Sequence, residues 1–297
     1  MSDAYLLRAQ NLVKYFPSRK GLFTGTKSWV KAVDGVSLQL RERENVAIVG
    51  ESGCGKTTLG RLLAGIIKPT SGSIDYEGVA LGSMKQLGVA KIVQPVFQDP
   101  VGALNPAVTI ETILARPFRI HHVRFDEDTL IGLLEQVGLS PGRSFLTRFP
   151  HQLSGGQRQR VVIARALALG PRLVIADEPV SGLDPTIQTQ ILALLLRIQR
   201  SRATAFLIIS HDINLVRSMC DRTIVMYLGK VVESGPTTEV LEHPIHPYTV
   251  SLLRSFPSGN PDETDWIDSP PLLGDIPSAV DPPSGCRFRT MSPRGVV

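Results

Sequence analysis

The sequence has few of the features that mark secreted, membrane-spanning or metal-stabilised proteins. Its 297 residues include only three cysteines, Cys54, Cys220 and Cys286, which lie far apart. An odd number of separated cysteines argues against a disulfide framework and a C-x-x-C metal site. No apolar run approaches the roughly 18 to 20 residues that a transmembrane helix needs. The amino terminus carries Asp3 and Arg8 where a signal peptide would be apolar, so we expect the chain to stay in the cytoplasm.

Aromatic residues are also scarce, at 6% of the chain, and the basic residues are scattered rather than interleaved with them. The net charge of +5 would suit nucleic acid or an anionic membrane, but this scattered distribution favours a solvated basic surface. Hydrophobic residues make up 42% and charged residues 20% of the sequence. These fractions are typical of a globular protein, and the length predicts one or two domains.

What the sequence does contain is a complete phosphate-binding motif. A short β-branched run at residues 46–49 predicts a buried strand, and residues 58–67 have a helical pattern. Between them lies the motif G-x-x-x-x-G-K-T. With the residue that follows, it comprises Gly50, Glu51, Ser52, Gly53, Cys54, Gly55, Lys56, Thr57 and Thr58. We predict that backbone N–H groups cradle the phosphates of a nucleotide, that Lys56 reaches the β and γ phosphates, and that Thr57 ligates Mg²⁺.

Two further apolar runs end in polar residues. Residues 173–176 are followed by Asp177 and Glu178, and residues 206–209 are followed by Ser210 and His211. Ligands of open α/β sheets bind at the carboxyl ends of the strands. We therefore expect Asp177 to hold the magnesium, Glu178 to polarise an attacking water, and His211 to contact the γ phosphate.

A second loop, "LSGGQRQR", resembles another phosphate-binding turn. Ser154 is a good N-cap for a helix over residues 157–169, and Gly155 and Gly156 allow close approach of an anion. Yet no lysine completes the cradle, so the motif, which ends with Gln157, is half of a site.

Together these motifs resemble those of the ATP-binding cassette (ABC) ATPases. The phosphate loop, "LSGGQ", the strand-terminal Asp-Glu, "SGLD" at residues 181–184 and His211 occur in the order and spacing of that family. The resemblance implies an α/β P-loop NTPase: a RecA-like core with an antiparallel β subdomain and an inserted helical subdomain. In that family the signature loop closes over ATP bound by the facing subunit, which explains the second, incomplete loop.

Further roles follow only from the resemblance. Gln98 in "VFQDP" looks like the glutamine that contacts magnesium and the attacking water and responds to the membrane partner, and Asp184 looks like the aspartate that communicates across the dimer. "NLVKYFP" resembles the segment whose aromatic residue stacks on adenine. Its spacing from Lys14 favours Phe16 over Tyr15, with core packing as the alternative for either ring.

The chain reads as one cassette domain with a tail. We assign residues 1–240 to the cassette, its core to about 1–98 and 166–240, and its helical subdomain, which should dock on a membrane subunit, to about 99–165. A helical pattern at residues 129–137 lies between breaks at Asn105-Pro106, Arg116-Pro117 and Phe149-Pro150. Residues 223–233 predict a hairpin turning at Gly229. Residues 17–30 look like an insertion, and proline-rich residues 241–297 are predicted to form an extended arm.

Several phrases, including "FQDP", "HPYT" and "PPSGCRF", resemble the dipeptide and oligopeptide import ATPases, in particular their second, F-type member. This resemblance implies ATP and Mg²⁺ as ligands, a second and usually non-identical ATPase, two permease subunits and an extracytoplasmic binding protein, with the chain peripheral on the cytoplasmic membrane face. Some relatives carry further cysteines that hold an iron–sulfur cluster. Here Ser292 stands at the next such position, so we expect Cys286 to hold no cluster.

Alternatives remain for cargo and class. Import of nickel or of short oligosaccharides would use the same motor. A soluble cassette ATPase acting on nucleic acid or ribosomes is disfavoured, because the two cassettes, long coiled coil or zinc insertions common in such proteins are not evident, and we expect no nucleic-acid partner. A cassette that binds ATP only to regulate is disfavoured by the presence of Glu178 and His211.

Overall fold

The computed structural model describes residues 5–18, 28–97, 99–201, 204–255, 277–280 and 282–291. The chain divides into two compact units. The first comprises residues 1–40, 44–82 and 209–297, and the second comprises residues 41–43 and 83–208.

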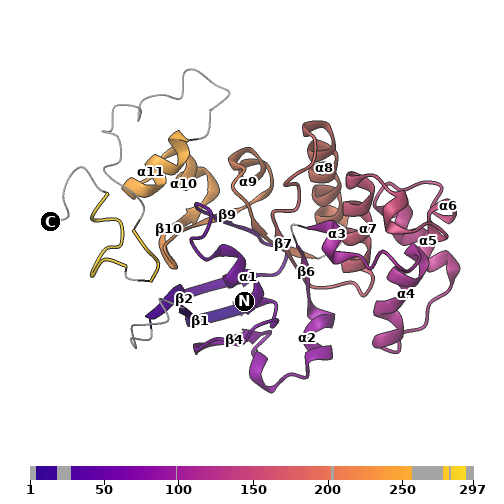
Figure 1. The fold of residues 1–297 in the computed structure, drawn as a ribbon, viewed down its shortest axis with the longest axis horizontal. Helices are drawn as coiled ribbons and strands as arrows, with labels where there is room; N and C mark the ends of the chain where they lie inside the picture. The colour runs from indigo at the N-terminus through magenta and orange to yellow at the C-terminus, as the bar shows by residue number, and fades with distance from the viewer. Residues whose placement is uncertain are drawn as a thin grey trace. The chain divides into compact units, whose positions relative to one another are not determined.

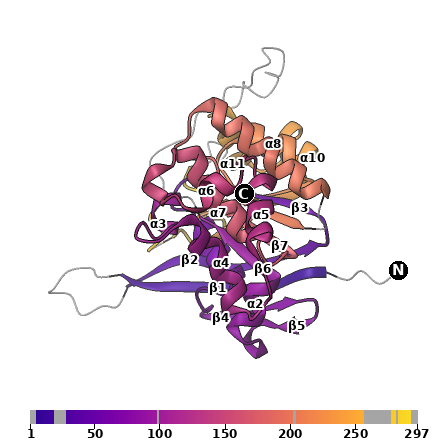
Figure 2. The same cartoon turned by 90° about the vertical axis from the view of Figure 1, so that its right-hand side faces the viewer.

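The first unit contains an antiparallel sheet with the strand order β2-β1-β4-β5. Its strands are β1 (Tyr5–Ser18), β2 (Ser28–Arg41), β4 (Ser71–Tyr76) and β5 (Val79–Ala80). Figure 2 shows β1 and β2 as two long neighbouring strands. Leu7 of β1 is fully buried and pairs with the equally buried Tyr76 of β4, so the core side of this sheet is apolar. The predicted insertion lies mostly outside the described residues, between Ser18 and Ser28.

Three further strands of this unit follow the order β10-β9-β3. Strand β3 (Asn45–Val49) is buried throughout and runs parallel to β9 (Arg222–Tyr227), with Val46 opposite Arg222 and Val49 opposite Val225. Strand β10 (Lys230–Pro236) returns antiparallel to β9. The predicted hairpin is confirmed: Gly229 has φ 80°, and a Cβ there would lie 2.6 Å from the carbonyl oxygen of Lys31.

In the described part of the first unit the helices are α1 (Lys56–Leu63), α9 (Ile213–Met219), α10 (Thr237–Glu242) and α11 (Pro247–Arg254). Helix α1 begins and ends earlier than the predicted residues 58–67. It ends because Gly65 turns at φ 70° and donates its N–H to the carbonyl of Leu62.

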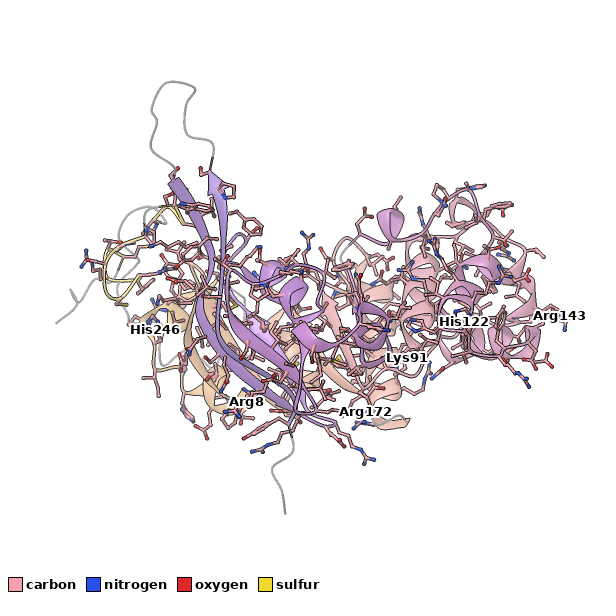
Figure 3. The ribbon with its side chains drawn as sticks, turned by 90° about the horizontal axis from the view of Figure 1, so that it is seen from below. Arg8, Lys91, His122, Arg143, Arg172 and His246 are labelled. Carbon is pink, nitrogen blue, oxygen red and sulfur yellow. The ribbon has the colours of Figure 1, made fainter. Side chains whose placement is uncertain are left out.

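The carboxyl-terminal residues are not a simple extended arm, so that prediction was wrong. Pro247 occupies the first turn of α11, where a missing N–H costs nothing. Downstream, Phe288 is only 2% exposed and packs on Tyr248, with ring centroids 5.7 Å apart. His246, labelled in Figure 3, lies against the same ring at 5.7 Å. The apolar residues between the prolines therefore join the core of the first unit.

The second unit contains three strands in the order β8-β7-β6 and most of the helices. Strands β6 and β7 run parallel, with Val93 opposite Leu173. The elements are α2 (Gln86–Ile92), β6 (Val93–Val96), α3 (Pro100–Ala103), α4 (Ile110–Ile120), α5 (Glu127–Gln136), α6 (Arg143–Leu146), α7 (Gly155–Leu167), β7 (Leu173–Asp177), α8 (Pro185–Ser201) and β8 (Ala205–Ile209). The three predicted strands thus all form. In Figure 1, α4, α5 and α6 gather beside α7, with which α4 and α5 are in contact.

One predicted break does not occur. Pro117 lies inside α4, which continues to Ile120. Its missing N–H removes one backbone hydrogen bond, but Ile113, Leu114 and Phe118 are buried on the same helix, and this packing outweighs the loss. Among the described helices, none is both long enough and apolar enough to cross a membrane.

Candidate nucleotide-binding site

The phosphate loop has a backbone that only glycine fits. Gly50 and Gly55 have φ values of 147° and 108°. A Cβ on Gly50 would lie 2.2 Å from the carbonyl oxygen of Met226, and one on Gly55 would lie 2.0 Å from that of Ala32. Gly55 is also the N-cap of α1. The loop therefore curves tightly into a helix start, the arrangement that binds anions.

Lys56 lies inside this curve. Its Nζ donates hydrogen bonds to the carbonyl oxygens of Gly50 at 2.6 Å and Glu51 at 2.8 Å, and the residue is 7% exposed. Burial raises the pKa of Glu51, and the Lys56 cation opposes that rise. Thr57, in the first turn of α1, is exposed. A buried ammonium group, a helix start and an exposed hydroxyl fit a nucleotide phosphate with its magnesium.

Residues distant in sequence fix the loop. The backbone N–H of Glu51 donates to the hydroxyl of Tyr248 at 2.9 Å, and the N–H of Gly229 donates to the carbonyl oxygen of Cys54 at 2.8 Å. Cys54 is 4% exposed, and burial raises the pKa of its thiol. This cysteine is thus a packed part of the loop and not a reactive thiol.

The two candidate aromatic residues differ in their surroundings. The hydroxyl of Tyr15 donates to Oδ1 of Asp34 at 2.5 Å, and this hydrogen bond raises the pKa of Tyr15. Phe16 is 38% exposed, and Lys14 Nζ lies 5.3 Å from its ring centroid. The hydroxyl of Tyr15 is therefore already hydrogen-bonded within the first unit, whereas the exposed ring of Phe16 is open to a ligand.

The first unit also positions His211. The N–H of Ser210 donates to the carbonyl oxygen of Ile48 at 3.2 Å, which places the Ser210–His211 turn at the carboxyl end of β3, where the phosphate loop begins. Asp212 then caps α9 by accepting from the N–H groups of Asn214 and Leu215. His211 itself is exposed.

In the second unit, the two adjacent acids adopt different backbone conformations. Asp177 ends β7 and is 5% exposed. Glu178 has φ 52°, which is uncommon for a residue with a Cβ and costs free energy that the surroundings must supply. Gln159 of α7 supplies one restraint, since its Nε2 donates to the carbonyl oxygen of Pro179 at 2.7 Å. This hydrogen bond restrains the turn that carries Glu178.

The signature loop is a locally capped helix start. Ser154 Oγ accepts from the N–H of Gln157 at 3.3 Å, while Oε1 of Gln157 accepts from the N–H of Ser154 at 3.0 Å. This capping box confirms the predicted N-cap, although α7 begins at Gly155. A Cβ on Gly156 would lie 2.6 Å from Cγ2 of Ile187. Asp184 Oδ1 accepts from the N–H of Ile187 at 3.0 Å, so the signature and the "SGLD" turn are neighbours.

The structure therefore groups the predicted residues in two sets. The first unit holds the phosphate loop, the aromatic pair and His211, and the second holds Asp177, Glu178, the signature and Asp184. Gln98 lies outside the described residues. Sequence reasoning assigned no role to Asp34, Gln159, Tyr248 or Arg287, although the last two stand in the quoted phrases "HPYT" and "PPSGCRF". Their partners are too distant in sequence for a local pattern to reveal.

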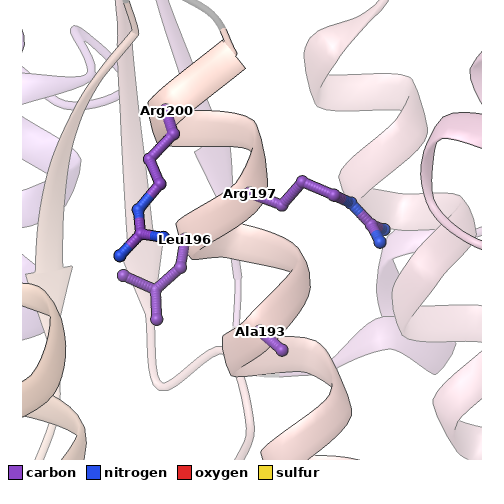
Figure 4. A pocket seen from close by; sticks show the side chains of 4 residues that line it. All are labelled: Ala193, Leu196, Arg197 and Arg200. Atoms are coloured by element: carbon purple, nitrogen blue, oxygen red, sulfur yellow. The ribbon is translucent and has the colours of Figure 1, made fainter.

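A depression on α8 is separate from these residues. Ala193, Leu196, Arg197 and Arg200 line it, and Figure 4 shows the two arginine side chains diverging from the helix. All four come from one helix, which makes it a shallow surface feature. Within the described ranges, no three acidic, histidine or cysteine side chains are grouped as a metal site would require.

Comparison with known proteins identifies the family. Residues 33–181 match the family model described as ABC transporter. The chain belongs to the ABC transporter family. The cassette also matches, over residues 232–295, the model described as the carboxyl-terminal region of oligopeptide/dipeptide transporters. This second match covers most of the hairpin strand β10 and all of α10 and α11.

Relatives of this ABC cassette are similar over almost its whole length. It is 44% identical over 295 residues to the oligopeptide transport ATP-binding protein AppF of Bacillus subtilis, covering 97% of this chain and 89% of the relative. It is 42% identical over 297 residues to OppF of Salmonella typhimurium, covering 97% and 88%. It is 43% identical over 290 residues to the dipeptide transport protein DppF of Escherichia coli, covering 95% and 85%.

A solved structure confirms the predicted fold class. The dimeric ATP-binding cassette MJ0796, solved in a post-hydrolysis state bound to ADP and phosphate, matches with a TM-score of 0.67 at 27% identity, covering 78% of this chain and 98% of that one. CbiO1 of Clostridium perfringens, part of a transporter complex, matches with a TM-score of 0.66 at 29% identity, covering 81% and 92%.

Proposed function

We propose that this ABC cassette is the ATP-hydrolysing motor subunit of an importer for dipeptides or oligopeptides. The observation that carries the proposal is the presence, in one chain, of a glycine-only phosphate loop around Lys56 and a match to the carboxyl-terminal region of peptide transporters. Relatives that match this chain nearly end to end are named as oligopeptide and dipeptide transport ATP-binding proteins. Their names support peptides over nickel or oligosaccharides as cargo.

The proposed site is shared between two cassettes. Lys56, Thr57, Gln98, Asp177, Glu178 and His211 of one chain would face Ser154, Gly156 and Gln157 of the other. The capped helix start at Ser154 supports this division, because it presents backbone N–H groups without a lysine of its own. Closure of the two chains over ATP would then bring the second half of the site to the phosphates.

Hydrolysis in this proposal depends on Glu178. Glu178 follows β7 with a left-handed backbone, and its carboxylate would accept a proton from the water that attacks the γ phosphorus as the bond to ADP breaks. His211 would hold the γ phosphate, and Lys56 would hold the β and γ oxygens. Thr57, Asp177 and Gln98 would hold Mg²⁺, which when bound neutralises phosphate charge.

Phe16 is the proposed platform for adenine. Its ring is exposed, whereas the hydroxyl of Tyr15 is bonded to Asp34. Stacking of a base on an aromatic ring contributes about 1 to 3 kcal/mol. Tyr15 would act by holding the strand that carries Phe16.

The proposed assembly contains a second cassette, two permeases and an extracytoplasmic binding protein, with this chain on the cytoplasmic face of the membrane. To test it, tagged Glu178→Gln protein is purified from detergent-solubilised membranes in Mg-ATP, and the chains that accompany it are identified by mass spectrometry. Two multispanning permeases and a second cassette are expected. Recovery only from the soluble fraction, with nucleic acid or ribosomes attached, would contradict the importer.

The catalytic assignment has its own test in the purified, paired complex. Glu178→Gln should bind ATP as the wild type does but lower turnover by about 10²- to 10⁴-fold, since the proton acceptor is lost. Glu127→Gln is the control, because that carboxylate is exposed on α5 and pairs with exposed Arg143. Unchanged turnover in Glu178→Gln would refute the assignment.

A further inference from the structure

The carboxyl-terminal segment, residues 247–254 and 282–291, reaches the phosphate loop through one peptide group. The Gly50–Glu51 peptide donates its N–H to the hydroxyl of Tyr248 and accepts, at its carbonyl oxygen, a hydrogen bond from Lys56 Nζ. A peptide group is planar, so fixing its N–H also fixes the direction of its carbonyl. Tyr248 is 1% exposed. Its hydroxyl therefore holds in place the peptide group whose carbonyl oxygen accepts the hydrogen bond from Lys56.

The same segment reaches the aromatic pair through Arg287. This arginine is 5% exposed, and its guanidinium donates to the carbonyl oxygen of Leu228 and to Oδ2 of Asp34. The other oxygen of Asp34 accepts from the hydroxyl of Tyr15, next to Phe16. Burial raises the pKa of Asp34, but the Tyr15 hydrogen bond and the Arg287 cation outweigh it and leave that pKa lowered. A continuous polar chain thus joins Arg287 to the strand that carries Phe16.

The residues that make these two connections are held by the same buried packing and backbone hydrogen bonds. Tyr248 packs on Tyr227 with ring centroids 4.5 Å apart, and Phe288, next to Arg287, packs on Tyr227 at 5.5 Å. Gly229, next to the Leu228 carbonyl, accepts the N–H of Asp34 and donates its own to Cys54 in the phosphate loop. Buried aromatic packing and paired backbone groups leave these residues little freedom. Tyr248 and Arg287 are therefore held before any ligand binds.

We propose that Tyr248 and Arg287 are positioning residues for the nucleotide: Tyr248 sets the phosphate loop and Arg287, through Asp34 and Tyr15, sets the adenine platform at Phe16. This proposal rests on the proposed function and adds that ATP affinity depends on the carboxyl-terminal segment. Groups fixed in their binding geometry lose less entropy when a ligand arrives. Loss of either connection should therefore weaken binding while the fold persists.

The test measures the Kd of Mg-ATP and of Mg-tripolyphosphate for the full chain by calorimetry, at a temperature where nucleotide-free urea unfolding shows each variant folded. Tyr248→Phe removes only the hydroxyl and should raise both Kd values by about threefold to tenfold, the value of one hydrogen bond. Tyr227→Phe is the matched control, because its hydroxyl donates to Met291 Sδ and not to the loop. It should change both Kd values less than twofold.

Arg287→Lys should raise the Kd of Mg-ATP by a similar factor but leave that of Mg-tripolyphosphate nearly unchanged, because it acts at the adenine end. Tyr15→Phe removes the hydroxyl bonded to Asp34 and should have the same effect on the two Kd values. This variant replaces Arg287→Lys in the test if Arg287→Lys does not fold. Equal effects of Tyr248→Phe and Tyr227→Phe, or unaltered ATP affinity in Arg287→Lys and Tyr15→Phe, would overturn the positioning roles. A wild-type chain that binds no Mg-ATP would instead refute the proposed function.

Discussion

The phosphate loop and the signature loop both present a helix start, but they are held in opposite ways. Ser154 and Gln157 cap the signature helix reciprocally, three residues apart. The phosphate loop has no side-chain cap on Gly55. It depends instead on Ala32 and Tyr248, neither of which is near it in sequence.

This difference suits the two proposed tasks. A cap made from neighbouring residues forms wherever the helix forms and leaves its surface open to a partner chain. A loop that packs against backbone distant in sequence forms only when the whole unit is folded. The folded unit then fixes the geometry that is needed to hold a highly charged ligand. Substitutions in the two loops should therefore differ in their effect on stability.

The largest expected effect comes from Gly55→Ala. Its Cβ would lie 2.0 Å from the backbone carbonyl of Ala32, which cannot move without displacing β2, and the residue has φ 108°. We expect a loss of more than about 4 kcal/mol in the free energy of unfolding, measured by urea denaturation of the nucleotide-free chain.

Gly53→Ala is the control for Gly55→Ala. It has φ 80°, but nothing lies within 4 Å of the added Cβ, so only backbone strain of about 1 to 2 kcal/mol should appear. Gly156→Ala, in the signature helix, meets the side chain of Ile187 rather than backbone. A loss in Gly156→Ala as large as in Gly55→Ala would erase the distinction between the two loops.

A second contrast concerns ion pairs. Arg287→Met would leave the Asp34 carboxylate, 19% exposed, without its buried partner, and should lower the free energy of unfolding by about 3 kcal/mol. Arg143→Met removes an ion pair with Glu127 in which the side chains are 69% and 52% exposed. This variant should change the free energy of unfolding by less than about 1 kcal/mol. Thermal and urea unfolding of both variants measure the difference. Equal losses would mean that the Arg287 pair acts like a surface pair.

Removal of the signature cap should have a smaller effect. Ser154→Ala loses the hydroxyl that accepts from Gln157 and should cost about 1 kcal/mol of unfolding free energy. Ser154→Asn keeps an N-cap acceptor and should restore most of that loss. If Ser154→Asn were as unstable as Ser154→Ala, the local cap would not explain the stability of this helix start.

The smallest expected effect is a pH dependence at Asp34. Because its pKa is lowered in the folded chain, its ionised form stabilises the fold at any pH above its ordinary pKa of 3.8. That stabilisation should be lost as pH falls below this value toward the lowered pKa. The difference in unfolding free energy between wild type and Asp34→Asn, measured from pH 7 to pH 3, should therefore shrink in acid. A difference that grew in acid would contradict a lowered pKa of Asp34 in the folded chain.

Sequence patterns were reliable where structure is local. The apolar runs before Gly50, Asp177 and Ser210 form strands, and Ser154 caps its helix, because these depend on neighbouring residues. Pro117 was misread as a break because the burial that tolerates it comes from tertiary packing. The carboxyl-terminal segment was misread for the same reason: its prolines signal loops, while its core contacts are made by Tyr248 and Phe288.

The sequence by itself determined the chemistry available to this protein: the glycines, lysine and acids of an ABC ATPase in their order along the chain. Only the tertiary structure decided what holds that chemistry in place. Tyr248 lies 197 residues from Glu51, and Arg287 lies 253 residues from Asp34. Contacts between residues so far apart leave no periodicity or spacing to read, because folding and not sequence proximity brings them together.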